Sequence, residues 1–128
     1  MKVKEVMHKG VDWVGPDTPI TEIAKLMSQH DVGSIPIGED DKLVGMVTDR
    51  DIACRGVVNG KDLAKLTARD VMSKGIFYCS DGEDLEDALR IMEQKQVRRL
   101  PVINDRKRMV GMLSLGDIAD AASHELSG

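Results

Sequence analysis

Gly45-Met46-Val47-Thr48-Asp49-Arg50-Asp51 is a stretch that recurs later in this 128-residue chain as Gly111-Met112-Leu113-Ser114-Leu115-Gly116-Asp117. In both copies an apolar run ends on a hydroxyl residue, and an aspartate follows three residues later. This spacing is typical of a strand that leads into a helix, with the hydroxyl residue at the N-cap. The recurrence predicts that the chain contains a duplicated unit.

The duplication extends outward from these two stretches over most of the chain. An offset of 65 residues aligns Val6-Met7 with Val71-Met72, and Pro36 with Pro101. One inserted residue in the second copy then makes the offset 66. We therefore predict two repeats, residues 1–60 and 67–128, joined by a linker at residues 61–66.

The sequence of each repeat predicts the same order of helices and strands. Apolar residues spaced i, i+3, i+4 and i+7 predict an amphipathic helix from Ile20 and another from Leu85. Thr18-Pro19 suits the N-cap and first position of the earlier helix. Two short apolar segments follow each helix and predict an antiparallel hairpin. The proline in the first segment of each hairpin favours an edge position or a strand start.

A second helix is expected after each hairpin, over about residues 49–58 and 115–122. Thr67-x-x-Asp70 predicts a capping box that opens a short helix. One β-α-β-β-α unit is too small to bury both faces of its sheet. We therefore expect an α+β fold in which the two repeats pack sheet to sheet with pseudo-two-fold symmetry, leaving equivalent clefts at their junction.

The composition limits the classes of function. The chain has 18 Lys and Arg against 22 Asp and Glu, a formal net charge of −4, and only 2% aromatic residues. These values argue against binding to nucleic acid or to an anionic membrane. With no apolar leader or membrane-length run, a cytoplasmic protein is expected. Cys54 and Cys79 are interpreted as small buried residues, with a redox sensor as the alternative.

The hydroxyl-x-x-Asp motifs have two interpretations. They can be capping boxes alone, or a helix start that attracts phosphate beside a carboxylate that binds a ribose. For either copy alone, capping is the preferred interpretation. Because Asp is shorter than Glu and reaches back to the cap less easily, its presence mildly favours an outward role for the carboxylate. The scattered His8, His30 and His124 predict no metal site, and no nucleophile-base pair or phosphate-binding loop indicates an enzyme.

The order of these motifs resembles a stand-alone pair of CBS domains, the regulatory modules named after cystathionine beta-synthase. The resemblance covers about residues 1–122 and implies binding of AMP, ADP, ATP, NAD or S-adenosylmethionine between the repeats, with no cofactor required. The first cleft implied in this way contains Met46, Thr48, Arg50, Asp51, Ile76, Phe77, Tyr78, Arg98 and Arg99. The second contains Val11, Asp12, Trp13, Ser34, Ile35, Met112, Ser114 and Asp117.

The two implied clefts differ in charge. Arg98-Arg99 and Arg50 would make the Thr48 cleft the better phosphate site, unless the arginine pair is only a solvated, ion-paired turn. The resemblance also implies a homodimer that regulates a protein partner not identified by the sequence. The alternative function is a ligand-free module for protein interaction or dimerisation.

Overall fold

The computed structural model describes residues 1–9, 13–74 and 76–127 of the chain, which divides into two compact units. One unit combines residues 1–11 with residues 77–128, and the other comprises residues 12–76. The units do not coincide with the sequence repeats, because the opening segment of each repeat packs on the core of the other. We call them the terminal unit and the central unit and describe each separately.

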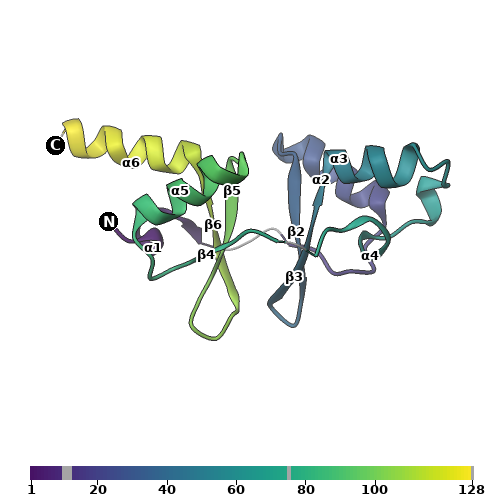
Figure 1. Ribbon diagram of the computed structural model, residues 1–128, viewed down its shortest axis with the longest axis horizontal. Helices are drawn as coiled ribbons and strands as arrows, with labels where there is room; N and C mark the ends of the chain where they lie inside the picture. The colour runs from purple at the N-terminus through teal and green to yellow at the C-terminus, as the bar shows by residue number, and fades with distance from the viewer. Residues whose placement is uncertain (10–12, 75, 128) are drawn as a thin grey trace. The chain divides into compact units, whose positions relative to one another are not determined.

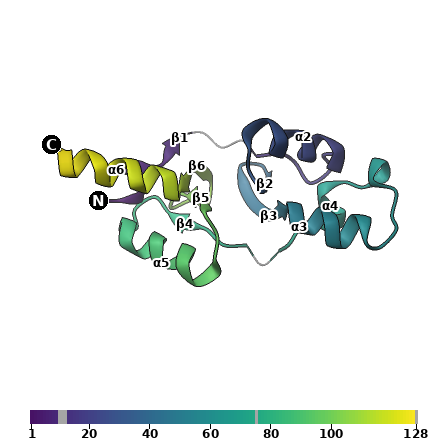
Figure 2. The same ribbon diagram turned by 90° about the horizontal axis from the view of Figure 1, so that it is seen from above.

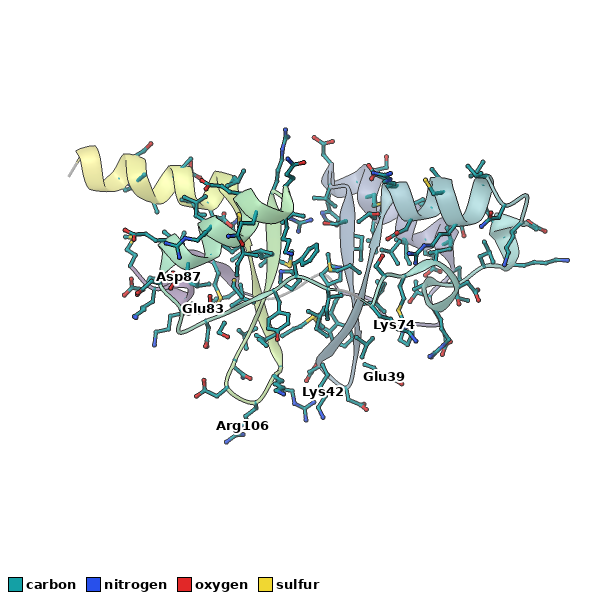
Figure 3. The ribbon with its side chains drawn as sticks, in the orientation of Figure 1. Glu39, Lys42, Lys74, Glu83, Asp87 and Arg106 are labelled. Atoms are coloured by element: carbon teal, nitrogen blue, oxygen red, sulfur yellow. The ribbon has the colours of Figure 1, made fainter. Side chains whose placement is uncertain are left out.

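The central unit contains the predicted helix and hairpin of the first repeat. Helix α2 (Ile20–His30) precedes the antiparallel strands β2 (Ser34–Glu39) and β3 (Lys42–Thr48). The turn between the strands is formed by Asp40 and Asp41, both with positive φ, at 54° and 64°. Positive φ at both central residues is typical of a type I′ turn, which matches the twist of the strands. The turn is flanked by two exposed charged residues, Glu39 and Lys42 (Figure 3).

The predicted second helix of the first repeat forms in two parts. Helix α3 (Asp49–Asp51) continues as the π-helical segment η1 (Ile52–Val57). The 3-10 turn η2 (Leu63–Lys65) and helix α4 (Ala68–Val71) complete the central unit. Arg55 Nη1 donates to the backbone oxygens of Val71 and Met72 at 3.2 and 3.1 Å. Arg55 thereby ties η1 to the end of α4.

The terminal unit contains a four-stranded sheet in the order β1-β6-β5-β4 (Figure 2). Figure 1 labels the strands β4, β5 and β6 of this sheet. The sheet pairs β1 with β6 and β5 with β6 in antiparallel fashion, and β4 with β5 in parallel. Three helices complete the unit. The bounds are α1 (Val3–Val6), β1 (His8–Lys9), β4 (Cys79–Ser80), α5 (Leu85–Lys95), β5 (Arg99–Ile103), β6 (Met109–Ser114) and α6 (Leu115–Ser127).

The central unit repeats this sheet layout with shorter edges. Ser73 bridges to Met46 on β3 in the place that β1 takes beside β6. Val14 bridges to Ile37 on β2 in the place of β4. The two units are therefore structural equivalents, and each has its own apolar core. The buried residues are Ile20, Ile23, Met27, Ile35, Ile37, Val47, Ala68 and Val71 in one core, and Val3, Cys79, Ala88, Met92, Leu100, Val102 and Leu113 in the other.

Two local predictions are wrong. Helix α2 begins one residue later than expected, so Pro19 is its N-cap and Thr18 is not. Pro101 lies inside β5, an inner strand, because β4 pairs only with the two residues after the proline and needs no bond from its missing N–H. Within the stretch predicted as a linker, residues 61–66, Leu63–Lys65 form η2 and the partly buried Leu66 packs on the central core.

Helix α1 is attached to the start of α5. Lys2 Nζ lies 2.8 Å from Asp84 Oδ1, and Val3 N–H donates to the backbone oxygen of Glu83 at 2.9 Å. The hydrogen bond with Lys2 lowers the pKa of Asp84 and raises that of Lys2. None of the helices in the described ranges has the length and apolar character needed to cross a bilayer.

Candidate functional site

The junction of β3 and α3 forms a complete capping box. Asp51 N–H donates to Thr48 Oγ1 at 3.0 Å, and Thr48 N–H donates to Asp51 Oδ2 at 2.9 Å. Both residues are half-buried. The sequence places a hydroxyl residue here because the first N–H groups of a helix have no partner within the helix.

The junction of β6 and α6 has the same geometry. Asp117 N–H donates to Ser114 Oγ at 3.1 Å, and Ser114 N–H donates to Asp117 Oδ2 at 3.0 Å. The expectation that the shorter aspartate points away from the cap is therefore wrong. Its carboxylate reaches the cap N–H through one oxygen, Oδ2, in both units.

The other carboxylate oxygen, Oδ1, meets a different partner in each unit. The hydroxyl of Ser73 donates to Asp51 Oδ1 at 3.3 Å. His8 Nε2 lies 2.7 Å from Asp117 Oδ1, and the side chain of Asp117 is only 10% exposed while that of His8 is 77% exposed. Each aspartate thus uses one oxygen to cap its helix and directs the other toward a neighbouring strand segment.

Two glycines allow these neighbouring segments to approach. A Cβ on Gly45 would lie 2.8 Å from Met72 Sδ and 3.1 Å from the Ser73 backbone oxygen. A Cβ on Gly111 would collide with the His8 backbone oxygen. The glycine that opens each motif is therefore required by packing, and it brings Ser73 and His8 within reach of the carboxylates.

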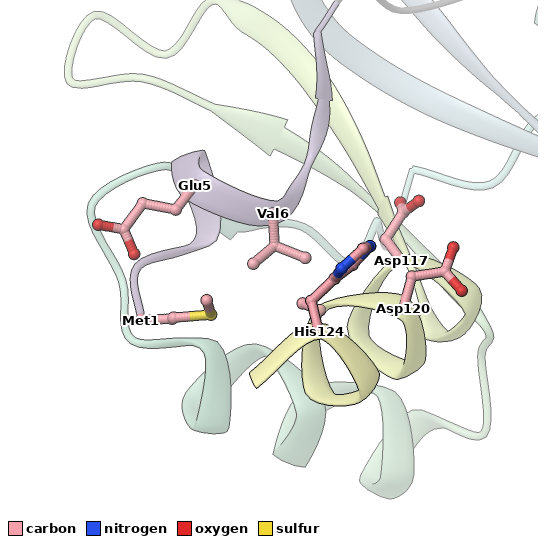
Figure 4. A pocket seen from close by; sticks show the side chains of 7 residues that line it. Met1, Glu5, Val6, Asp117, Asp120 and His124 are labelled. Carbon is pink, nitrogen blue, oxygen red and sulfur yellow. The ribbon is translucent and has the colours of Figure 1, made fainter. Parts of the chain in front are cut away.

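A pocket of about 500 Å³ opens beside Asp117 in the terminal unit (Figure 4). Helix α1 contributes Glu5 and Val6, and α6 contributes Asp117, Asp120 and His124. The pocket thus combines three carboxylates and a histidine with an apolar remainder. Sequence analysis did not find this pocket, because α1 and α6 come from opposite ends of the chain.

The other predicted site residues are distributed between the two units. In the central unit Ser34 pairs with Thr48, and Ile35 is buried at 2% exposure. In the terminal unit Arg99 pairs with Ser114, Met112 is buried at 6% exposure, and Phe77 and Tyr78 are exposed. Met46, Trp13 and Ile76 are half-buried, Arg50 and Arg98 are exposed, and Val11 and Asp12 lie outside the described residues. The pairing of residues across the two repeats stays a prediction.

The two cysteines differ in accessibility. The interpretation of both cysteines as buried is wrong for Cys54, which is exposed on η1. Cys79 is buried on β4, where burial raises the pKa of its thiol to about 12. At pH 8 only about one Cys79 thiol in ten thousand is ionised, and thiolate is the reactive form. We expect iodoacetamide to label Cys54 in the native protein and Cys79 only after denaturation, as measured by peptide mass spectrometry. Rapid native labelling of Cys79 would contradict this burial and favour the redox alternative.

A solvent-exposed sulfur alone does not make a metal site. Over residues 1–9, 13–74 and 76–124, histidine, cysteine and acidic side chains do not gather in groups of three or more that could hold an ion. Among the described residues, the carboxylates of Asp51 and Asp117 are therefore the main repeated groups that could bind a ligand.

Fold and motif together define a tandem repeat protein in which a hydroxyl-x-x-Asp capping box follows the hairpin of each unit. The family model named CBS domain matches residues 3–58 and 68–124. The chain therefore belongs to the CBS domain family, and it contains two copies of the domain. This membership confirms the resemblance and the α+β fold with two repeats.

Two relatives match along nearly the full chain. The CBS domain-containing protein YhcV of Bacillus subtilis is 42% identical over 127 residues, which cover 98% of this chain and 89% of that protein. Hypoxic response protein 1 of Mycobacterium tuberculosis is 40% identical over 117 residues, which cover 91% of this chain and 81% of that protein.

Solved structures of CBS domain pairs superimpose well on this chain. Hypoxic Response Protein I with two coordinated zinc ions has 38% identity and a TM-score of 0.83, with 94% of this chain and 98% of that chain covered. CBSX2 in complex with AMP has 27% identity and a TM-score of 0.81, with 96% of each chain covered. The pair from MJ0100 in complex with 5′-methylthioadenosine and S-adenosyl-L-methionine has 25% identity and a TM-score of 0.78, with 98% of each covered.

Proposed function

We propose that this chain is a non-catalytic regulatory module that binds an adenosine-containing ligand in clefts between its two CBS repeats. Candidate ligands are AMP, ADP, ATP, NAD and S-adenosylmethionine. The proposal rests on the observation that the two oxygens of each aspartate carboxylate, in Asp51 and in Asp117, have different partners. One oxygen caps the helix and fixes the carboxylate, and the other meets a partner that a ribose hydroxyl could replace.

The Thr48 site suits this role because its competing contact is weak. Asp51 Oδ1 accepts from Ser73 at 3.3 Å, a long distance for a hydroxyl-carboxylate hydrogen bond. Two ribose hydroxyls would form shorter charge-assisted bonds to the same oxygen. The AMP complex of CBSX2 and the S-adenosyl-L-methionine complex of MJ0100 support this choice of ligand class.

Binding regulates only if the ligand has different affinities for two states of the protein. We propose that the module forms a homodimer in the cytoplasm and changes its affinity for a protein partner when ligand is bound. No metal is needed for this function, although Hypoxic Response Protein I holds zinc.

A ligand-free interaction module is the second candidate, and the complete capping boxes favour it. A thermal-shift panel with adenosine, AMP, ATP, NAD and S-adenosylmethionine separates the two candidates. A ligand at a hundred times its dissociation constant stabilises the folded state by about 2.7 kcal/mol. We expect at least one adenosine compound to raise the melting temperature, with guanosine and GMP as controls. No shift with any adenosine compound would favour the second candidate.

A further inference from the structure

The partner of the carboxylate is the feature in which the two otherwise equivalent sites differ most. Ser73 and His8 both follow a Val-Met pair and hold the same place beside β3 and β6. Ser73 offers Asp51 a neutral hydroxyl at 3.3 Å, whereas His8 offers Asp117 an imidazole nitrogen at 2.7 Å. Imidazole, unlike a hydroxyl, gains a positive charge within the physiological pH range.

The contact between His8 Nε2 and Asp117 Oδ1 can break by rotation of the His8 side chain. The His8 backbone is fixed by pairing with Met112 on β6, but its side chain is 77% exposed. The ring can therefore rotate into solvent without unpairing β1. Asp117, in contrast, is 10% exposed and fixed by the Ser114 N–H. Opening the contact thus moves the imidazole and leaves the carboxylate in place.

Other ionisable groups surround this pair. Glu5 on α1, together with Asp120 and His124 on α6, lines the pocket that Asp117 also lines (Figure 4). Lys9 follows His8 on β1. His124 is a second imidazole in the same pocket, so an experiment must separate its protonation from that of His8.

We propose that His8 is a pH-dependent gate on the Ser114–Asp117 site. A ribose can bind Asp117 Oδ1 only after the imidazole leaves, and a protonated imidazole leaves less readily because it forms an ion pair. Acid supplies the proton that gives an imidazole its positive charge. Acid therefore closes the Ser114–Asp117 site and leaves the Thr48–Asp51 site open, so that one module has one constant site and one pH-gated site. This inference rests on the proposed function.

The test uses adenosine, which carries no phosphate, and the full chain with one site removed. In Asp51→Ala, titration calorimetry should show affinity about two- to fivefold lower at pH 5.5 than at pH 8, the effect of one ion pair whose cationic partner is exposed. Adding His8→Ser should abolish this difference, whereas adding His124→Gln should preserve it. In Asp117→Ala, adenosine affinity at the remaining Thr48–Asp51 site should not depend on pH. Adding Ser73→His, which places an imidazole beside Asp51, should make that affinity fall at low pH.

The ion pair itself is measured without ligand. At pH 5.5, with EDTA present, the NMR signals of the His8 ring should move in Asp117→Asn and stay in place in Asp120→Asn. Adenosine binding that keeps its pH dependence in His8→Ser would overturn the gate and leave the proposed function intact. Adenosine binding to none of the proteins would overturn both. Unmoved His8 signals in Asp117→Asn would overturn the gate alone.

Discussion

Replacing Asp51 with alanine is expected to weaken adenosine-ligand binding at the Thr48 site by ten- to a hundredfold. The substitution removes the oxygen that would accept the ribose hydroxyls, and a hydrogen bond to a charged group contributes about 1.5–3 kcal/mol. It also removes the acceptor for the Thr48 N–H, at 2.9 Å. Loss of a helix cap costs about 1 kcal/mol of folding free energy. Affinity must therefore be measured by calorimetry below the melting temperature of the variant.

Asp70 provides a matched control for this substitution. It closes the same kind of box, because Thr67 N–H donates to Asp70 Oδ2 at 2.8 Å at the start of α4. Asp70→Ala should therefore lose similar stability and keep its affinity for the ligand. If Asp51→Ala and Asp70→Ala both bind AMP as tightly as the unmodified protein, Asp51 is a helix cap and nothing more.

Local sequence patterns predicted the elements that local interactions determine. The helices at Ile20–His30 and Leu85–Lys95 and both hairpins follow from apolar spacing within a few residues, and all four form. The helix that follows the second hairpin is longer than expected and extends to Ser127. These predictions succeeded because amphipathic spacing acts over one or two helical turns.

The sequence could not show which core each opening segment would join. Strand β1 pairs over only two residues, His8 and Lys9, and its partner β6 lies at the other end of the chain. So short a pairing has no periodic signal of its own. The exchange of opening segments between repeats, which brings His8 to Asp117, therefore became visible only in three dimensions.

One signal in the sequence did point to these partners. His8 and Ser73 occupy equivalent positions in the two repeats, directly after Val-Met. Because the two motifs are equivalent as well, a partner found for one aspartate predicts the partner of the other. The difference between histidine and serine at this position therefore distinguishes the two sites more directly than Arg50 or Arg98, both of which are exposed.

The same short pairing makes Gly111 the position with the largest expected effect on stability. A Cβ there would collide with the backbone oxygen of His8 and lie 2.8 Å from Met7 Sδ. A side chain end can move aside, but a backbone atom moves only if β1 shifts away from β6. Overpacking of this kind costs about 1–3 kcal/mol. We expect Gly111→Ala to lower the melting temperature by about 4–12 °C.

Gly82→Ala is the control for this experiment, because a Cβ on Gly82 meets nothing within 4 Å and lies in the same unit. Its melting temperature should stay within about 2 °C of the unmodified protein. In Gly111→Ala the shifted β1 should also carry His8 away from Asp117, so the variant should lose the acid sensitivity of adenosine binding together with its stability. A Gly111→Ala protein that melts at the same temperature as Gly82→Ala would show that β1 does not pack against β6 as closely as described.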